Sequence, residues 1–194
     1  MKARSFRLGD IEPSPTRHGV GVRPSAGDLL SYELSVIAAE PLDAVRAAGG
    51  WMCDRVRAGW KVNVLVPQRF DPRPLGILGV RAYALETDLE LLTADPAALA
   101  VSAQAWDLDA RMRRNVVRAV ERRAIEVSVW GARPPEVAGR VEPVVHRLSP
   151  AARAFKAQAL IAAGDDPAAG TASEEFHSCA LWYPLDGPDL ISAG

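Results

Sequence analysis

The stretch from Ser31 to Pro67 constrains the fold more than any other part of the chain. Apolar and polar residues alternate over 32–36, an apolar run follows, and alternation returns over 61–66, which is typical of two β-strands. Between them, Pro41 suits the first turn of a helix, apolar residues recur at three- and four-residue steps, and Gly59 suits a helix end. Two strands joined by one crossover helix are expected to be parallel and right-handed.

The middle of this helix holds the pair Gly49-Gly50. A glycine inside a helix costs up to about 1 kcal/mol relative to alanine, so its presence needs a reason. Nothing polar converges on the pair in the sequence. We therefore expect close packing of the helix on the sheet rather than contact with a ligand.

The rest of the chain extends the same pattern of alternating strands and helices. Strands are predicted over 80–85 and 124–130, a short one at 144–145, and helices over 72–78, 96–106, 107–123 and 151–163. In the strand at 124–130, Glu126 and Ser128 share one face, which predicts an edge strand or one exposed face. The order predicts an α/β fold with a mainly parallel sheet of about four or five strands and helices on both faces.

We expect three regions along the chain. Residues 1–27 are rich in Pro, Gly and basic side chains without apolar periodicity, and are predicted to form a flexible basic arm. Residues 28–163 form the single α/β domain. Residues 164–194 form an acidic tail with aromatic residues and no Lys or Arg.

The predicted layout is Rossmann-like in outline and resembles receiver and flavodoxin-like domains. The resemblance covers the topology only. The first strand ends in Ala39-Glu40-Pro41-Leu42 without the paired acids of a receiver, and a receiver's phosphorylatable Asp after a later strand is absent as well. The same loop lacks the glycines that let a backbone approach a pyrophosphate, so no nucleotide cofactor is predicted.

Composition limits the functional classes further. The net charge of −1 gives no bulk attraction to nucleic acid or membrane, and nucleic acid is an unlikely partner. No apolar run approaches the length of a bilayer span, and two cysteines set up no disulfide framework, so we expect a cytoplasmic protein. The preference for Arg over Lys suggests a bacterial source. His177 and Cys179 could supply two metal ligands, but no second pair has zinc-site spacing, so no metal is predicted.

Two surfaces favour a binding function without catalysis. One is a basic stripe on the helix at 107–123, where arginines recur every three or four residues: Arg111, Arg114, Arg118 and Arg122. The other is the tail, whose aromatic residues include Phe176, Trp182 and Tyr183, and such residues often anchor interfaces. Our main prediction is a non-catalytic interaction or regulatory protein on a degenerate α/β scaffold that binds a protein partner or another copy of itself.

The alternative prediction is a small-molecule-binding protein or an enzyme. Ligands of open α/β sheets bind at the carboxyl ends of the strands. Polar side chains follow the predicted strands at these ends: Glu40, Arg69, Asp71 and Glu86. Carboxylates and guanidinium groups in such a place can perform acid–base chemistry or hold a polar ligand.

Overall fold

The computed structural model describes residues 32–67, 70–85, 96–123, 125–179 and 191–192. In this part of the chain, eight strands form one sheet in the order β3-β2-β1-β4-β5-β7-β6-β8. The strands are β1 Glu33–Ile37, β2 Lys61–Val66, β3 Arg81–Ala84, β4 Ala98–Ser102, β5 Glu126–Trp130, β6 Glu142–Arg147, β7 Ser173–Ser178 and β8 Ile191–Ser192. The helices are α1 Pro41–Arg57, α2 Arg73–Ile77, α3 Ala110–Arg122 and α4 Pro150–Ala162, with 3-10 turns η2 Ala103–Ala105 and η3 Pro167–Ala169.

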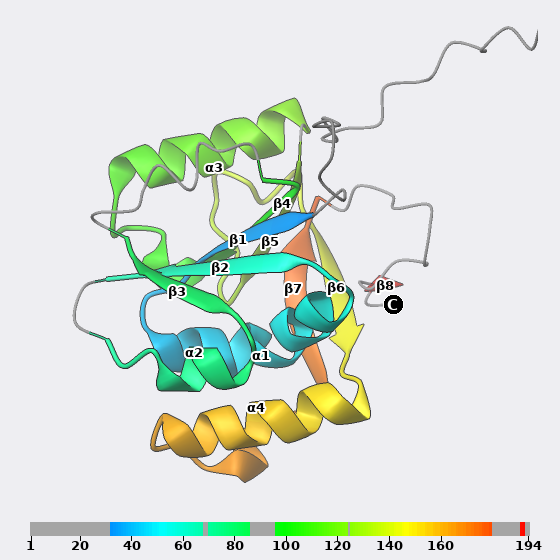
Figure 1. Ribbon diagram of the computed structural model, residues 1–194. Helices are drawn as coiled ribbons and strands as arrows, with labels where there is room; N and C mark the ends of the chain where they lie inside the picture. Colours follow the sequence, from blue (N-terminus) through cyan, green and yellow to red (C-terminus); the bar gives the residue numbers. More distant parts are fainter. Residues whose placement is uncertain (1–31, 68–69, 86–95, 124, 180–190, 193–194) are drawn as a thin grey trace, which may run out of the picture.

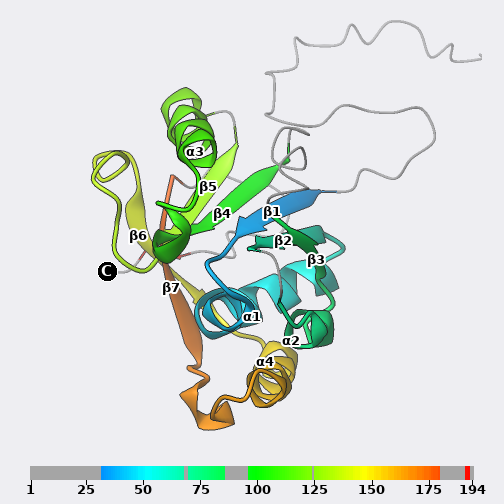
Figure 2. The same ribbon diagram turned by 90° about the vertical axis from the view of Figure 1, so that its left-hand side faces the viewer.

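The predicted α/β architecture is confirmed. Strands β3, β2, β1, β4 and β5 are mutually parallel, and β7, β6 and β8 extend the sheet in antiparallel pairs. Helices α1 and α2 lie on one face of the sheet, α4 packs against both of them, and α3 covers the other face (Figure 1), as the turned view also shows (Figure 2). The sheet has more strands than the four or five predicted. It also continues past residue 163, into the segment predicted as a tail.

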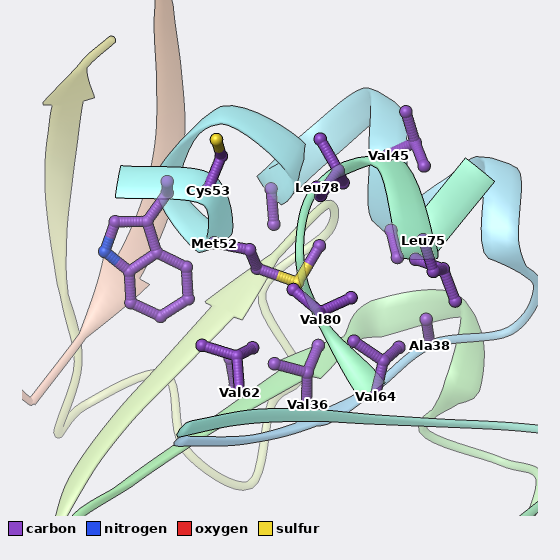
Figure 3. Packing of buried hydrophobic residues seen from close by; sticks show 14 of the residues in the cluster. Val36, Ala38, Val45, Met52, Cys53, Val62, Val64, Leu75, Leu78 and Val80 are labelled. Atoms are coloured by element: carbon purple, nitrogen blue, oxygen red, sulfur yellow. The ribbon is translucent and has the colours of Figure 1, made fainter. Parts of the chain in front are cut away.

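Each face of the sheet has its own hydrophobic core. On the first face, valines of β1 and β2 lie under Met52 of α1, under Leu75 of α2 and under Leu78, which directly follows α2 (Figure 3). On the second face, Met112, Val116 and Val120 of α3, which are spaced by four residues, pack against the strands. Leu108 precedes the helix and is 48% exposed. The parallel strands are therefore buried on both sides.

Strand β4 corrects the prediction of a helix over 96–106. Its sequence, ALAVS, is rich in alanine, which favours helices, but all five residues are buried between β1 and β5. A central parallel strand needs small or apolar residues on both faces, so the periodicity of two that marks a half-exposed strand is missing. Packing within the sheet decides the structure here against the intrinsic propensity.

Strand β5 is also more buried than predicted. We expected Glu126 and Ser128 to mark an edge or an exposed face, and this is wrong because β7 pairs with the outer side of β5. The Ser128 hydroxyl donates to Ser178 Oγ at 3.0 Å, and Arg55 donates to Glu126 at 3.2 Å. Both polar side chains thus have partners inside the protein.

A carboxylate on strand β7, that of Glu174, contacts the backbone of helix α1. Glu174 is 3% exposed and accepts hydrogen bonds from the Gly50 and Trp51 amides at 2.8 and 2.7 Å. Lys156 of α4 donates to Glu174 at 2.5 Å and to the Arg46 carbonyl at 2.6 Å. In a regular helix the Arg46 carbonyl and the Gly50 amide are partners of each other. Here each has a partner from outside α1, so the ion pair joins α1, α4 and β7 at one point.

The two glycines in the middle of α1 lie beside leucine side chains of neighbouring segments. A Cβ atom on Gly50 would lie 2.1 Å from Leu148 Cδ2 and 2.3 Å from Leu148 Cγ, in the connection between β6 and α4. A Cβ on Gly49 would lie 3.4 Å from Leu78 Cδ1. Close packing thus accounts for Gly50, whereas a Cβ on Gly49 would make only ordinary contacts, and the predicted packing on the sheet is not what the pair shows. Its partners are neighbouring elements on the helical layer rather than the sheet itself.

The Gly50→Ala substitution should lower the free energy of unfolding by about 1 to 3 kcal/mol, because the new methyl group overlaps the branch point of Leu148. Gly76→Ala is the matched control, since it also lies in a helix and no atom lies within 4 Å of its Cβ position. It should raise stability by up to about 1 kcal/mol. Urea unfolding of both variants measures the difference, and equal effects would contradict this account.

Removing one partner of the buried ion pair should be more costly than removing both. Lys156→Met leaves the Glu174 carboxyl buried without its cation and should lower stability by about 3 to 5 kcal/mol. The double variant Lys156→Met, Glu174→Gln should recover part of that loss, because no lone charge remains. A double-mutant cycle by urea unfolding measures the coupling, and additive losses would show that the two charges act independently.

Candidate functional site

The topology places a switch point between β1 and β4. The chain leaves the carboxyl end of β1 toward α1 on one face, and it leaves the carboxyl end of β4 toward α3 on the other (Figure 2). In open α/β sheets, ligands bind outside the carboxyl ends of the strands at such a point, because the two departing connections leave room there. The edge formed by the ends of β1, β4 and β5 is therefore the candidate site.

One buried carboxylate connects the elements at this edge. Asp43, in the first turn of α1, accepts a hydrogen bond from the Ala39 amide at 3.2 Å and one from the Trp130 indole at 2.9 Å. Asp43 is 9% exposed and Trp130, the last residue of β5, is 3% exposed. Both carboxylate oxygens thus have N–H donors, and the loop after β1 is tied to the end of β5.

The Asp43–Trp130 bond passes over the end of β4. Trp130 is in register with Ser102, the last residue of β4, which lies between β1 and β5. Ser102 is fully buried, and its hydroxyl accepts from the Gln104 amide at 3.1 Å to begin the turn η2. Gly131, at a φ of 84°, then turns the chain away from β5, and its Cβ position lies 3.2 Å from Ala103. The ends of the three strands are thus closely packed and fixed.

Of the four residues predicted at the strand ends, Glu40 lies at this edge. It is exposed and is the N-cap residue of α1, yet its side chain makes no capping hydrogen bond. Asp71 follows β2, on the far side of β1, and is exposed beside Arg73, whose guanidinium hydrogen bond lowers the pKa of the Asp71 carboxyl. Arg69 and Glu86 lie outside the described residues.

Sequence reasoning missed the residues beneath Glu40. It gave Asp43 no part in the site, and it placed Ser102 within the predicted helix over 96–106. The sequence does contain a signal for Asp43. Glu40 is a polar residue at the end of a strand, and Asp43 follows three residues later, at the third position of the helix. Its partner Trp130 could not be found, because the contact spans 87 residues of sequence.

The predicted partner-binding residues divide into three groups. The arginines of the basic stripe, Arg111, Arg114, Arg118 and Arg122, are all exposed along α3, and their role stays a prediction. Next to this stripe, Asp107 pairs with Arg113 at 2.6 Å. Phe176 is 2% exposed and lies 5.0 Å from Trp51 between ring centroids, so its side chain belongs to the protein's own core. Trp182 and Tyr183 lie outside the described residues.

A second polar cluster joins α1 to the start of α4. Asp54 accepts from the Ser149 amide at 3.0 Å and lies 3.0 Å from His146 Nε2. The Ser149 hydroxyl accepts from the Ala152 amide as the N-cap of α4. A nucleophilic triad needs the serine hydroxyl on the histidine. Here the histidine and the serine both contact the carboxylate, so the cluster is a structural one.

The described residues contain no group of three or more His, Cys, Asp or Glu side chains placed to hold a metal ion. Among the same residues, no helix combines the length and the apolar character that crossing a membrane requires. Cys53 and Cys179 are both free thiols.

Comparison with known proteins supports the fold. No protein-family model and no curated protein matches the sequence. Among solved structures, the conserved protein TT1542 from Thermus thermophilus is similar at a TM-score of 0.52, with 17% identity over 80% of this chain and 99% of that one. The A40926 pseudoaglycone deacetylase Dbv21 is similar at 0.51, with 16% identity over 76% of this chain and 96% of that one. A triple mutant of a deacetylase of the teicoplanin biosynthetic pathway reaches 0.50, with 14% identity over 76% and 98%.

These likenesses correct the main functional prediction. We predicted a non-catalytic interaction or regulatory protein on a degenerate scaffold. Two of the three similar structures are named as deacetylases, so the fold is one that enzymes use. A fold that enzymes use agrees better with the alternative prediction than with a degenerate scaffold without catalysis.

The Asp54 cluster predicts loss of stability in acid. Burial raises the pKa of the Asp54 carboxyl, but hydrogen bonds from Ser149 and His146 outweigh burial, and the net pKa is lowered. A carboxyl with a lower pKa in the folded state stabilises the protein above its unfolded pKa of about 3.9, and this contribution is lost as the pH falls through the folded pKa. Between pH 6 and pH 3, Asp54→Asn should therefore lose less unfolding free energy than the parent in urea titrations. An equal loss in both proteins would contradict this role.

Proposed function

We propose that this chain is a small-molecule enzyme or binding protein whose site lies at the carboxyl ends of β1, β4 and β5. The observation that carries the proposal is the position of Glu40. It is an exposed carboxylate on a loop that Asp43 and Trp130 tie to β5 at the switch point. A carboxylate held in this way can act as a base or bind a polar group of a ligand.

The removal of an acyl group from an amine is the reaction that we propose to test first. The names of two structurally similar proteins support this choice, since both are deacetylases. In such a reaction the water oxygen attacks the amide carbonyl carbon, and the C–N bond breaks. The amine leaves with a proton, and the acyl group leaves as a carboxylate. Glu40 would accept the proton of the attacking water.

We further propose that the protein works in the cytoplasm. Both cysteines are free thiols, and disulfide bonds would be expected more often in a small protein from an oxidising compartment. Two free thiols, Cys53 (buried) and Cys179, are typical of a protein from a reducing compartment.

Substitution of Glu40 tests the proposal directly. The parent protein should release the acyl group from teicoplanin or from N-acetylglucosamine, measured by mass spectrometry of both products. Glu40→Gln keeps the shape of the side chain and removes its basicity, so it should lower kcat by about a hundredfold or more. Glu175→Gln is the matched control, because Glu175 is exposed on β7.

The outcomes separate the two forms of the proposal. Saturable binding of either compound without product would support a binding protein and reject the hydrolytic reaction. Equal turnover by the parent and Glu40→Gln would exclude Glu40 as the base. Neither binding nor turnover of either compound would overturn the proposal for acylated amines.

A further inference from the structure

The hydrogen bond from the Ala39 amide to the Asp43 carboxylate closes a short loop that contains Glu40. Asp43 Oδ2 holds the amide of Ala39, the residue immediately before Glu40, and Asp43 itself lies three residues after Glu40. The backbone of Glu40 is extended, with φ −157° and ψ 163°, which ends the strand geometry just as the helix begins. The position of the Glu40 backbone is therefore set from both sides by one carboxylate.

The second bond of that carboxylate fixes the loop to a different strand. Trp130 Nε1 reaches Asp43 Oδ1 at 2.9 Å from the end of β5, two strands away from β1. The backbone ladders already hold β1, β4 and β5 in register. They act on the strands, whereas the Trp130–Asp43 bond acts on the loop that follows. This bond therefore holds the loop that contains Glu40 in position relative to the residues that follow β5.

The burial of the pair shows that this bond is strong. A buried carboxylate that loses a donor bears the desolvation cost of the unpaired group, and hydrogen bonds to charged groups are stronger than those between neutral groups. A bond of this kind resists small displacements of the loop. Functional groups need such support, because a misplacement of about 1 Å can cost a hundredfold in rate.

We infer that Asp43 and Trp130 are positioning residues of the proposed site, and that their hydrogen bond sets where Glu40 stands relative to the end of β5. The inference rests on the proposed function, because it assigns these residues to the same site. Neither side chain is expected to contact the reacting atoms. They act through the β1–α1 loop.

Hydrogen–deuterium exchange tests the positioning without any ligand. Asp43→Asn keeps the shape of the side chain and removes its charge, and Trp130→Phe keeps a buried ring and removes its N–H. In both variants the amides of Ala38, Ala39, Glu40 and Leu42 should exchange at least about tenfold faster, while those of β2 stay unchanged. Asp71→Asn is the control, since Asp71 also follows a parallel strand but contacts only Arg73 among the described residues. It should leave the loop unchanged.

Binding of teicoplanin tests the link to the site. Isothermal titration should show the Kd raised about tenfold by Asp43→Asn and by Trp130→Phe, and unchanged by Asp71→Asn. Circular dichroism checks that each variant is folded. If one of the two variants does not fold, the other is sufficient for the test. Unchanged exchange in the 38–42 loop, or an unchanged Kd in a protein that binds teicoplanin, would overturn the inference.

The two proposals fail in different ways. If the parent protein does not bind teicoplanin, the proposed function fails for this ligand, and the assignment to a binding site falls with it. If the parent binds and the two variants bind equally well, the proposed function stands and the positioning role is wrong.

Discussion

The ion pair of Lys156 and Glu174 is the interaction on which most of the structure depends. It joins a strand late in the sequence, the last helix and the first helix, and it supplies partners to backbone groups in the middle of α1. Burial raises the pKa of the Glu174 carboxyl, while the lysine charge and two amide donors oppose the rise. Two charges enclosed in a core are tolerated only with such complete hydrogen bonding. These hydrogen bonds therefore tie helix α1 to both α4 and β7.

The position of α1 in turn determines the candidate site. The helix begins at the carboxyl end of β1, so its first turn presents Asp43 to Trp130 and leaves Glu40 exposed. Farther along the same helix, the Gly50 and Trp51 amides donate to Glu174. Near the end of the helix, Asp54 contacts His146 and Ser149. One helix thus carries the candidate site at its start and two groups of anchoring hydrogen bonds along its length.

Local sequence was sufficient for the unit from β1 through α1 to β2 and insufficient for the central parallel strand β4. The unit from β1 to β2 was predicted almost to the residue, because a half-polar strand and an amphipathic helix each have their own period. Strand β4 was missed, since five small or apolar residues in a central strand look like part of a helix. In the same way, Glu40 was found because an exposed polar residue at a strand end is a local feature. The Asp43–Trp130 and Glu174–Gly50 contacts join residues 87 and 124 apart, and no local pattern reports such pairs.

The place of β7 has a consequence for the order in which the protein can be completed on the ribosome. Strand β5 has an open side until residues 173–178 pair with it, and β6 is synthesised earlier but pairs with β7 rather than with β5. A nascent chain that has emerged only to the end of α4 therefore exposes the unpaired edge of β5, and it holds Lys156 without its carboxylate. Unpaired strand edges favour association between chains. Strand β7 thus protects the growing chain as well as extending the sheet, and slow synthesis of this strand would prolong the period in which the edge of β5 is open.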